Sequence, residues 1–266
     1  MSPRTIKLTI EYDGAAYAGW QYQANALSIQ QVMEQALESL THVKTRLNAS
    51  GRTDAGVHAL GQVAHFTTES RMSPEAFVRG FNTLLPPDIA VKSAEEVPVD
   101  FSARHSAKGK RYRYLIYNDP VRSAHLRNYS WHIRKKLDIN AMRQAAEHLL
   151  GEHDFSAFRS ANCDAPHAVR EIHELSVTVT PPDIVPFSLA LPRVEEPAGL
   201  PRIIVVEAHA TAFLKQMVRN IVGTLEEVGR ERMTPEQVKS ILEGKDRRHA
   251  GPTAPPQGLF LVSVDY

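Results

Sequence analysis

Hydrophobic residues in the first third of the chain follow two different periods. From Thr5 to Tyr12 every second residue is apolar, which is typical of a half-buried strand. After Ser28 and Gln31, which form a capping-box pair, the apolar residues share one helical face up to residue 40. Further strands are predicted over 43–49, 62–69 and 89–97, and a second helix over 73–84. The predicted order is β-α-β-β-α-β.

The second half of the chain repeats this order with one added helix. Strands are predicted over 110–118, 169–180, 202–211 and 258–265, and helices over 138–150, 213–229 and 235–243. The Pro-rich stretch 181–201 interrupts a strand pair and is predicted to be a surface insertion. We therefore expect an α+β fold of two ferredoxin-like or RRM-like halves, 1–105 and 106–266, that form an extended, mainly antiparallel sheet with helices on one side.

Composition narrows the class of protein. Among 266 residues, 42% are hydrophobic, yet no apolar run approaches the length that spans a bilayer, and the start alternates like a strand instead of a signal peptide. These features predict a cytoplasmic protein. The single cysteine, Cys163, excludes an internal disulfide, and its spacing from His167 and His173 matches no common zinc pattern. We therefore expect no metal.

Charge is informative only in its distribution, because the net charge is +1. Basic residues gather in 103–114 and 122–136, where tyrosines and a tryptophan are interleaved with them. Arginine and lysine bind phosphates and aromatic faces stack on bases, so the two clusters are candidates for RNA binding. A solvated edge strand with tyrosines in the core explains them equally well.

The loop GRTDAGVHALGQ, residues 51–62, places Arg52 and Asp54 on backbone rich in glycine. Ordinary turn chemistry explains an aspartate before a glycine. A P-loop does not fit, because Gln62 and Val63 stand where lysine and serine or threonine are needed. The surroundings of the loop must decide its role.

Four segments together point to one family. They are EYDGAAYAGWQ, GRTDAGVHALGQVAHF, KGKRYRYLIYN and FLKQMVRNIVG. With them the chain resembles the bacterial tRNA pseudouridine synthases of the TruA type, from about residue 6 to the C-terminus. The resemblance implies isomerisation of uridine to pseudouridine at positions 38, 39 and 40 of the tRNA anticodon stem-loop. It also implies a homodimer, a central RNA-binding cleft, and no cofactor or metal.

The resemblance also assigns roles to residues. Asp54 matches the catalytic aspartate, and Arg219 matches the arginine that pairs with it. Tyr112 matches the active-site tyrosine, which lies against the flipped uracil and is a candidate for proton transfer at C5. From the residues alone, Tyr112 is also explained as a strand aromatic in the core, and Arg219 as a surface residue of a helix. Aromatics of 112–117 alternate between two faces of a strand, and only the family match selects Tyr112 to face RNA.

Two further sets of residues are expected to bind the substrate. Arg52, two residues from the carboxylate, is hypothesised to fill the place that the flipped uridine leaves and to contact phosphate. Leu214 and Val218, with Phe213 and Met217 on the same predicted helix, are expected to form an apolar wall. Core packing explains these apolar residues equally well.

Two other classes of protein compete with the synthase. A non-catalytic RNA-binding protein of two RRM-like sheets needs no Asp54, and KRYRYLIYN approximates the RRM strand signature only distantly. A zinc-dependent nucleobase deaminase needs a Pro-Cys-x-x-Cys motif, which a single cysteine excludes.

Overall fold

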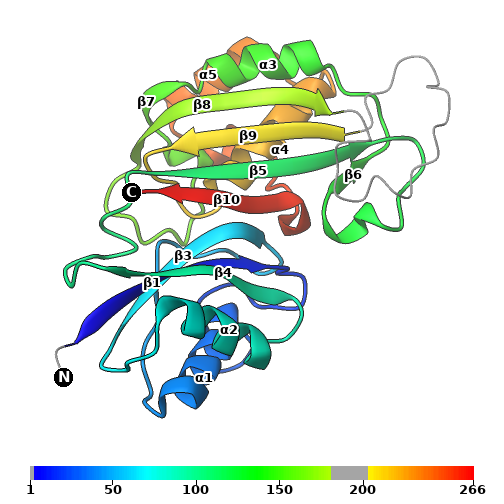
Figure 1. Cartoon of the computed structure of the whole chain (residues 1–266). Helices are drawn as coiled ribbons and strands as arrows, with labels where there is room; N and C mark the ends of the chain where they lie inside the picture. Colours follow the sequence, from blue (N-terminus) through cyan, green and yellow to red (C-terminus); the bar gives the residue numbers. More distant parts are fainter. Residues whose placement is uncertain (1–2, 181–202) are drawn as a thin grey trace. The chain divides into compact units, whose positions relative to one another are not determined.

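The computed structural model describes residues 3–180 and 203–266 (Figure 1). It contains ten strands in mainly antiparallel pairing and five α-helices within these residues, which confirms the α+β class. The chain divides into two compact units. Unit 1 comprises Met1–Lys110 and Phe260–Tyr266, and unit 2 comprises Arg111–Leu259. In the described part of the chain, no helix is both long and apolar enough to cross a membrane.

Unit 1 has the predicted β-α-β-β-α-β order. Its elements are β1 (Arg4–Tyr12), α1 (Ile29–Thr41), β2 (Asn48–Ala49), β3 (His58–Thr68), α2 (Pro74–Leu84) and β4 (Ile89–Val97), joined by most of β10 (Leu259–Asp265). The strand order is β4-β1-β3-β10, with β2 paired to β3. β1 is antiparallel to both of its neighbours, whereas β10 runs parallel to β3.

The core of unit 1 lies between this sheet and its two helices. The alternation of β1 buries Ile6, Leu8 and Ile10 completely. Both helices begin at serine caps, since the Ser28 side chain accepts a hydrogen bond from the Gln31 amide and Ser73 caps α2 in the same way. The caps fix where each helix starts, and therefore which apolar face meets the sheet.

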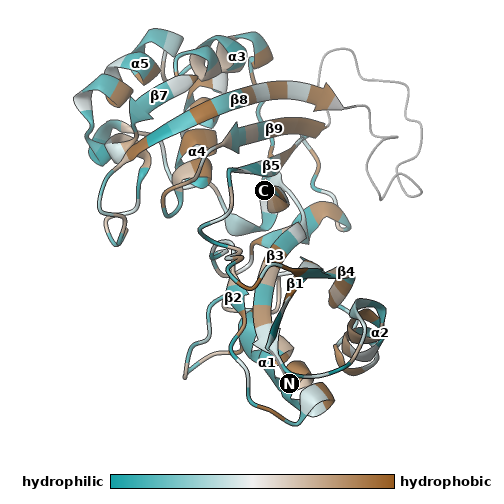
Figure 2. Cartoon of the chain, turned by 60° about the vertical axis from the view of Figure 1, so that its left-hand side comes forward, coloured by the Kyte–Doolittle hydropathy of each residue, from teal (hydrophilic) through white to brown (hydrophobic). Residues whose placement is uncertain are grey.

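Unit 2 contains the remaining strands of the ten-stranded sheet. Its elements are β5 (Gly109–Asn118), β6 (Trp131–Ile133), α3 (Ile139–Glu147), β7 (Gly151–Asp154), β8 (Val169–Thr180), β9 (Ile203–Ala210), α4 (Met217–Gly229) and α5 (Pro235–Gly244). The strand order is β5-β9-β8-β7, with β6 paired to β5. α3 contacts α4, α5 and β8. Apolar and polar residues alternate along β8 (Figure 2), and a register shift between Ile172 and Glu174 brings Leu175 and Val177 back to the buried side.

The structure departs from the predicted elements in several places. β3 begins at His58 instead of residue 62. The strand predicted over 43–49 is only Asn48–Ala49, because the Leu47 amide donates to Glu34 of α1 (2.9 Å) instead of to a neighbouring strand. β6 and β7 were not predicted, since strands of three and four residues carry almost no period. α4 begins at Met217 instead of residue 213, because Gln216 before it adopts a left-handed conformation (φ 61°).

The last strand of the chain joins the first unit. Residues 106–110 and 260–266 belong to unit 1, whereas chain order alone assigns both stretches to the second half. The period of a strand does not reveal which sheet it joins, because the pairing partner is remote in sequence. The division into domains at residue 105 stays a prediction. The predicted insertion at 181–201 lies outside the described residues.

Candidate active site

Residues 50–57, here called the Asp54 loop, join β2 to β3 in unit 1. A buried glutamine on β3 fixes the start of this loop. The side-chain oxygen of Gln62 (Oε1) accepts from the Ser50 hydroxyl (2.8 Å), and its side-chain nitrogen (Nε2) donates to the Gly51 carbonyl (3.1 Å). Gln62, which stands where a P-loop needs its lysine, therefore holds backbone in place.

The centre of the Asp54 loop is fixed through Thr53. Its hydroxyl shares a hydrogen bond of 2.8 Å with the hydroxyl of Tyr12, and its carbonyl accepts from the Trp20 amide (3.1 Å). Burial raises the pKa of Tyr12 to about 12, although its hydrogen bonds with Thr53 and Gln62 oppose that shift. Tyr12 therefore stays protonated at neutral pH and keeps the threonine side chain pointing into unit 1.

Two glycines let the segment 11–21 lie directly against the Asp54 loop. Gly19 has a φ of +90°, and a Cβ atom there would lie 2.5 Å from the Thr53 carbonyl oxygen. A Cβ atom at Gly14 would lie 2.0 Å from the Val57 carbonyl oxygen. The motifs EYDGAAYAGWQ and GRTDAGVH are thus two sides of one backbone contact, which gives a physical reason for their occurring together.

Arg52 and Asp54 flank the buried Thr53 and are the accessible charged side chains of this loop. Arg52 is exposed and Asp54 is half-buried. The turn itself is closed by main chain, because the Val57 amide donates to the Asp54 carbonyl (3.1 Å). A carboxylate and a guanidinium are thereby presented on a backbone that the threonine and the glycines hold fixed.

Lys110, at the end of unit 1, supports the same loop and was missed at the level of sequence. Its ammonium donates to the Ser50 carbonyl (2.7 Å), and a Cβ atom at Gly51 would lie 2.9 Å from its nitrogen. Burial lowers the pKa of Lys110 to about 8, and the charge of Arg104 adds to this effect. The only signal in the sequence is that Lys110 belongs to the basic run KGKRYRY.

Unit 2 carries the other predicted site residues. Tyr112 lies on β5, is 9% exposed, and meets the ring of Phe213 edge-on with centroids 5.1 Å apart. Tyr114, two residues further on and therefore on the same face of the strand, is fully buried and donates to the Pro255 carbonyl (2.7 Å). Both tyrosines are buried, so exposure does not tell them apart, but Tyr112 contacts the ring of Phe213 whereas Tyr114 donates to the Pro255 carbonyl.

Leu214 and Val218 are both buried, but they do not share a helix. Since α4 begins at Met217, Phe213 and Leu214 lie in the segment before it, and the prediction of one apolar helix face over 213–218 was wrong. Val218 lies in the first turn of α4, and the Met217 amide donates to the Leu214 carbonyl (3.0 Å). The turn before the helix, not the helix period, places Leu214.

Arg219 is a half-buried residue of α4 whose orientation is set by a neighbouring segment. Its Nε donates to the Ala254 carbonyl (2.7 Å), and the Ala254 amide donates back to the Arg219 carbonyl (3.1 Å). This hydrogen bond at Nε fixes the plane of the guanidinium, a group that pairs with planar anions such as carboxylates. Arg219 is therefore built into unit 2 and is not the freely moving surface residue of the simpler interpretation.

Comparison with known proteins identifies the family. A family model described as tRNA pseudouridine synthase matches residues 8–106 and 145–266. A tRNA pseudouridine synthase A of Myxococcus xanthus is 50% identical over 98% of this chain and 91% of its own length. Proteins of the same name from Pelobacter propionicus and Geobacter sulfurreducens are 49% and 47% identical over 99% of this chain and all of theirs. With matches across both units, this chain belongs to the tRNA pseudouridine synthase family.

Proposed function

We propose that this protein isomerises uridine to pseudouridine in tRNA, with Asp54 as the catalytic residue. The observation that carries the assignment is the construction of the Asp54 loop. Buried Thr53 and the close glycine contacts fix the backbone on either side of an accessible carboxylate. Membership of the family supplies the reaction for which such a carboxylate is needed.

The reaction rearranges bonds without net oxidation or hydrolysis. The bond between uracil N1 and ribose C1′ breaks, the base turns, and a bond between C5 and C1′ forms. The proton on C5 leaves, and N1 of the product carries a proton. The Asp54 carboxylate acts at the sugar, either as a nucleophile at C1′ or as a base at C2′.

The other predicted residues take supporting roles in this proposal. Arg219 pairs with the Asp54 carboxylate and keeps it ionised and oriented. Tyr112 lies against the flipped uracil and serves the proton transfer at C5, while Leu214 and Val218 contribute apolar surface to the base. Their burial in unit 2 is consistent with a dry surface for a base.

The substrate that we propose is the anticodon stem-loop of tRNA, modified at positions 38, 39 and 40 by a homodimer in the cytoplasm. Local basic clusters with interleaved aromatics suit RNA binding by a chain whose net charge is only +1. Primer extension on chemically labelled tRNA maps the modified positions, and light scattering on the eluting protein gives the number of subunits.

The decisive experiment follows release of tritium from tRNA that carries tritium at uracil C5, with no cofactor or metal added. Wild type should release tritium into water, whereas Asp54→Asn should release it at least about a thousandfold more slowly, because the group acting at the sugar is lost. The matched control is Asp100→Asn, the same change at an exposed aspartate of unit 1, which should keep wild-type activity.

The outcomes separate the two candidate functions. If wild type binds tRNA and releases no tritium, the protein is a non-catalytic RNA-binding module and Asp54 is a turn residue. If Asp54→Asn is as active as wild type, the protein is a synthase whose catalytic residue lies elsewhere.

Arg52 is assigned to base flipping, because it is exposed and lies two residues from the carboxylate on the same fixed loop. Arg52→Lys keeps the charge but loses the planar fork, so tRNA affinity should stay within a few-fold and turnover should fall by about tenfold. Filter binding and tritium release measure the two quantities. An unchanged turnover would remove this role.

A further inference from the structure

The segment 250–258, here called the strap, contacts both elements of unit 2 that carry predicted site residues. The main chain of its Ala254 forms two hydrogen bonds with Arg219 of α4: the amide donates to the Arg219 carbonyl, and the carbonyl accepts from the Arg219 Nε. Its Pro255 carbonyl accepts from the Tyr114 hydroxyl (2.7 Å), on the strand that also carries Tyr112. A residue that fixes the strap therefore also fixes the surroundings of Arg219 and of the strand that carries Tyr112.

Arg247 is the residue that holds the strap. One terminal nitrogen donates to the carbonyls of Ala250 (3.2 Å) and Gly251 (2.9 Å). The other donates to the Asn220 side-chain oxygen (3.1 Å) and the Thr253 hydroxyl (3.2 Å). Four neutral oxygens thus surround one half-buried guanidinium. A charged donor strengthens each of these hydrogen bonds, and its planar shape sets their directions.

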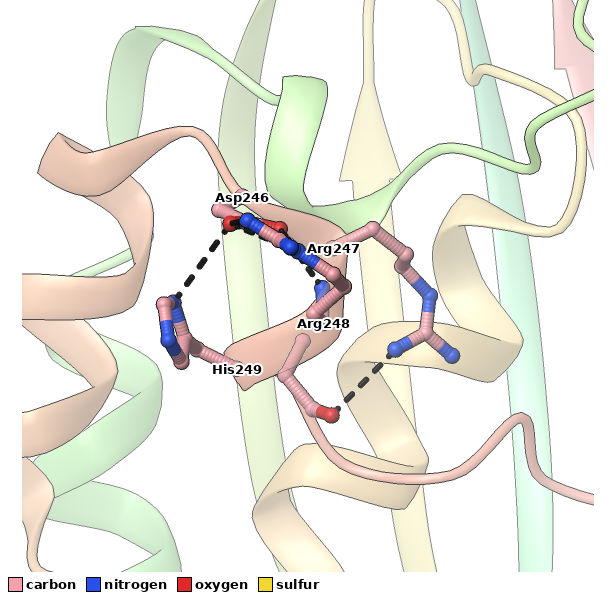
Figure 3. Close-up of polar contacts among 5 residues, drawn as sticks. Asp246, Arg247, Arg248 and His249 are labelled. Carbon is pink, nitrogen blue, oxygen red and sulfur yellow. Dashed lines mark hydrogen bonds and ion pairs between the residues drawn. The ribbon is translucent and has the colours of Figure 1, made fainter.

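The neighbouring residues of the same turn behave differently. Arg248 pairs with Asp246 (2.6 Å) and its side chain is 87% exposed, while His249 lies 3.9 Å from the same carboxylate. Figure 3 shows the Arg247 guanidinium turned away from this acidic residue and toward a carbonyl of the following turn. Of these two adjacent arginines, Arg247 is therefore fixed by four hydrogen bonds, whereas Arg248 is exposed to solvent.

The strap meets α4 backbone to backbone next to Arg219. Asn220 is fully buried, accepts from Thr253 (2.7 Å) as well as from Arg247, and donates to the Phe158 carbonyl (2.8 Å). At Gly223 a Cβ atom would lie 1.7 Å from the Pro252 carbonyl oxygen, so no side chain fits between α4 and the strap at this point. A small movement of the strap would displace Ala254 and with it the carbonyl that accepts from the Arg219 Nε.

We propose that Arg247 is a positioning residue for the synthase reaction, acting through the strap to set the orientation of Arg219. This inference rests on the proposed function, in which Arg219 orients the catalytic carboxylate. Arg247 itself does not touch the reacting atoms in this assignment. Loss of its four hydrogen bonds should let Ala254 move relative to α4, and the Arg219 guanidinium should then lose its fixed direction. Misplacing an orienting group by about 1 Å can cost about a hundredfold in rate.

The test compares Arg247→Ala with Arg248→Ala, the matched change at the exposed neighbour. Single-turnover tritium release at saturating tRNA, tRNA affinity and thermal melting are measured for each. For Arg247→Ala we expect the rate to fall on the order of tenfold with affinity nearly unchanged. Arg248→Ala should match wild type in all three. A rate for Arg247→Ala equal to that of wild type would overturn the inference.

A second pair of variants separates positioning from stability. Arg219→Lys keeps a cation but lacks the Nε donor to Ala254. In that variant the strap can no longer orient the side chain at position 219 through this hydrogen bond. Arg247→Ala should then cause little further loss of rate. An equal loss in both backgrounds would show that Arg247 acts only on the stability of the fold.

A milder variant covers the case in which Arg247→Ala fails to fold. Thr253→Val removes the hydroxyl that bridges Arg247 and Asn220 without changing size, and Thr253→Ser restores it. We expect a lower rate for the valine and recovery for the serine, and equal rates for the two would contradict the proposal. If wild type itself releases no tritium, the proposed function has failed, and that result is distinct from an active wild type whose strap variants are unimpaired.

Discussion

The Asp54 loop of unit 1 and the strap of unit 2 do the same work by different means. Each bonds to or contains a buried residue that is next in sequence to a predicted site residue: Thr53 of the loop precedes Asp54, and Asn220 of α4, which Thr253 of the strap contacts, follows Arg219. The Asp54 loop is held by main-chain approach at glycines and by hydrogen bonds with three different side chains, those of Tyr12, Gln62 and Lys110. The strap shares such a close glycine contact, at Gly223, and is held in addition by the four hydrogen bonds of one arginine side chain.

This difference has consequences for substitution. A contact between two backbones leaves no space for an added carbon, so changes beside the Asp54 loop should first damage the fold. A side-chain network at the surface of a helix can lose a member while the helix stays folded, so changes around the strap should first damage the rate. Substitutions beside the Asp54 loop should therefore lower stability before turnover, whereas substitutions around the strap should lower turnover before stability.

The largest expected effect is that of Gly19→Ala. The new methyl group would lie 2.5 Å from the Thr53 carbonyl oxygen, and the φ of +90° is strained for any residue with a Cβ atom. The free energy of unfolding should fall by about 2–4 kcal/mol, as for other severe packing and backbone conflicts. Urea denaturation of the full chain, followed by circular dichroism, measures it.

Gly244→Ala is the matched control for this change. At the end of α5, a Cβ atom on Gly244 would meet no heavy atom within 4 Å. Alanine should therefore leave stability unchanged or raise it by up to about 1 kcal/mol, because it restricts the unfolded chain. Equal stabilities of the two variants would contradict the backbone contact between residue 19 and the Asp54 loop.

A smaller effect is expected from Thr53→Val, which removes one hydroxyl and keeps the shape. The Tyr12 hydroxyl would lose the closer of its two hydrogen-bond partners in a buried setting, at a cost of about 1–2 kcal/mol in the free energy of unfolding. Turnover should fall as well, since Asp54 is the next residue. Tritium release and urea denaturation are measured together on each variant.

Thr53→Ser keeps the hydroxyl and should recover most of both losses. If Thr53→Val loses turnover while keeping full stability, the contrast between the two units is wrong for this residue. If it loses stability while keeping full turnover, the buried hydroxyl does not position the carboxylate.

Local patterns explain how much of the fold could be predicted. The period of two over Thr5–Tyr12 and the serine caps at Ser28 and Ser73 act within a few residues, so the sequence shows them directly. The order of elements in unit 1 follows from such signals. The Asp54 loop was found because its glycines and polar residues stand together in one motif, and the family resemblance then gave the motif a role.

Contacts between remote residues explain what could not be predicted. Lys110 reaches a carbonyl sixty residues earlier in the chain, and Arg247 reaches Asn220 across 27 positions, so neither leaves a local period. The left-handed turn at Gln216 delays the start of α4 without any glycine to mark it. Hydrophobic patterning also fails to assign β10 to unit 1, since its partner β3 lies about two hundred residues away.

The smallest expected effect is a pH dependence that comes from Lys110, the side-chain support of the Asp54 loop. Burial lowers the pKa of this lysine in the folded chain to about 8, whereas its usual value is 10.5. Between these values the unfolded chain binds more protons than the folded one, so the free energy of unfolding rises with pH. Below pH 8 the full cost of burying the charge is present, and above pH 10.5 it is gone.

Lys110→Met removes this titration and therefore isolates it. The stability of the methionine variant relative to wild type should decline between pH 7.5 and 9, by no more than about 1 kcal/mol. Urea denaturation at closely spaced pH values measures the difference, with Lys108→Met as the control at an exposed lysine two residues earlier. A relative stability that stays constant, or that rises with pH, would mean that Lys110 is not held charged against its burial. The Asp54 loop would then be held by its glycine contacts and by the hydrogen bonds of Thr53 and Gln62, and the arginine-held strap would be the clearer case of support by a charged side chain.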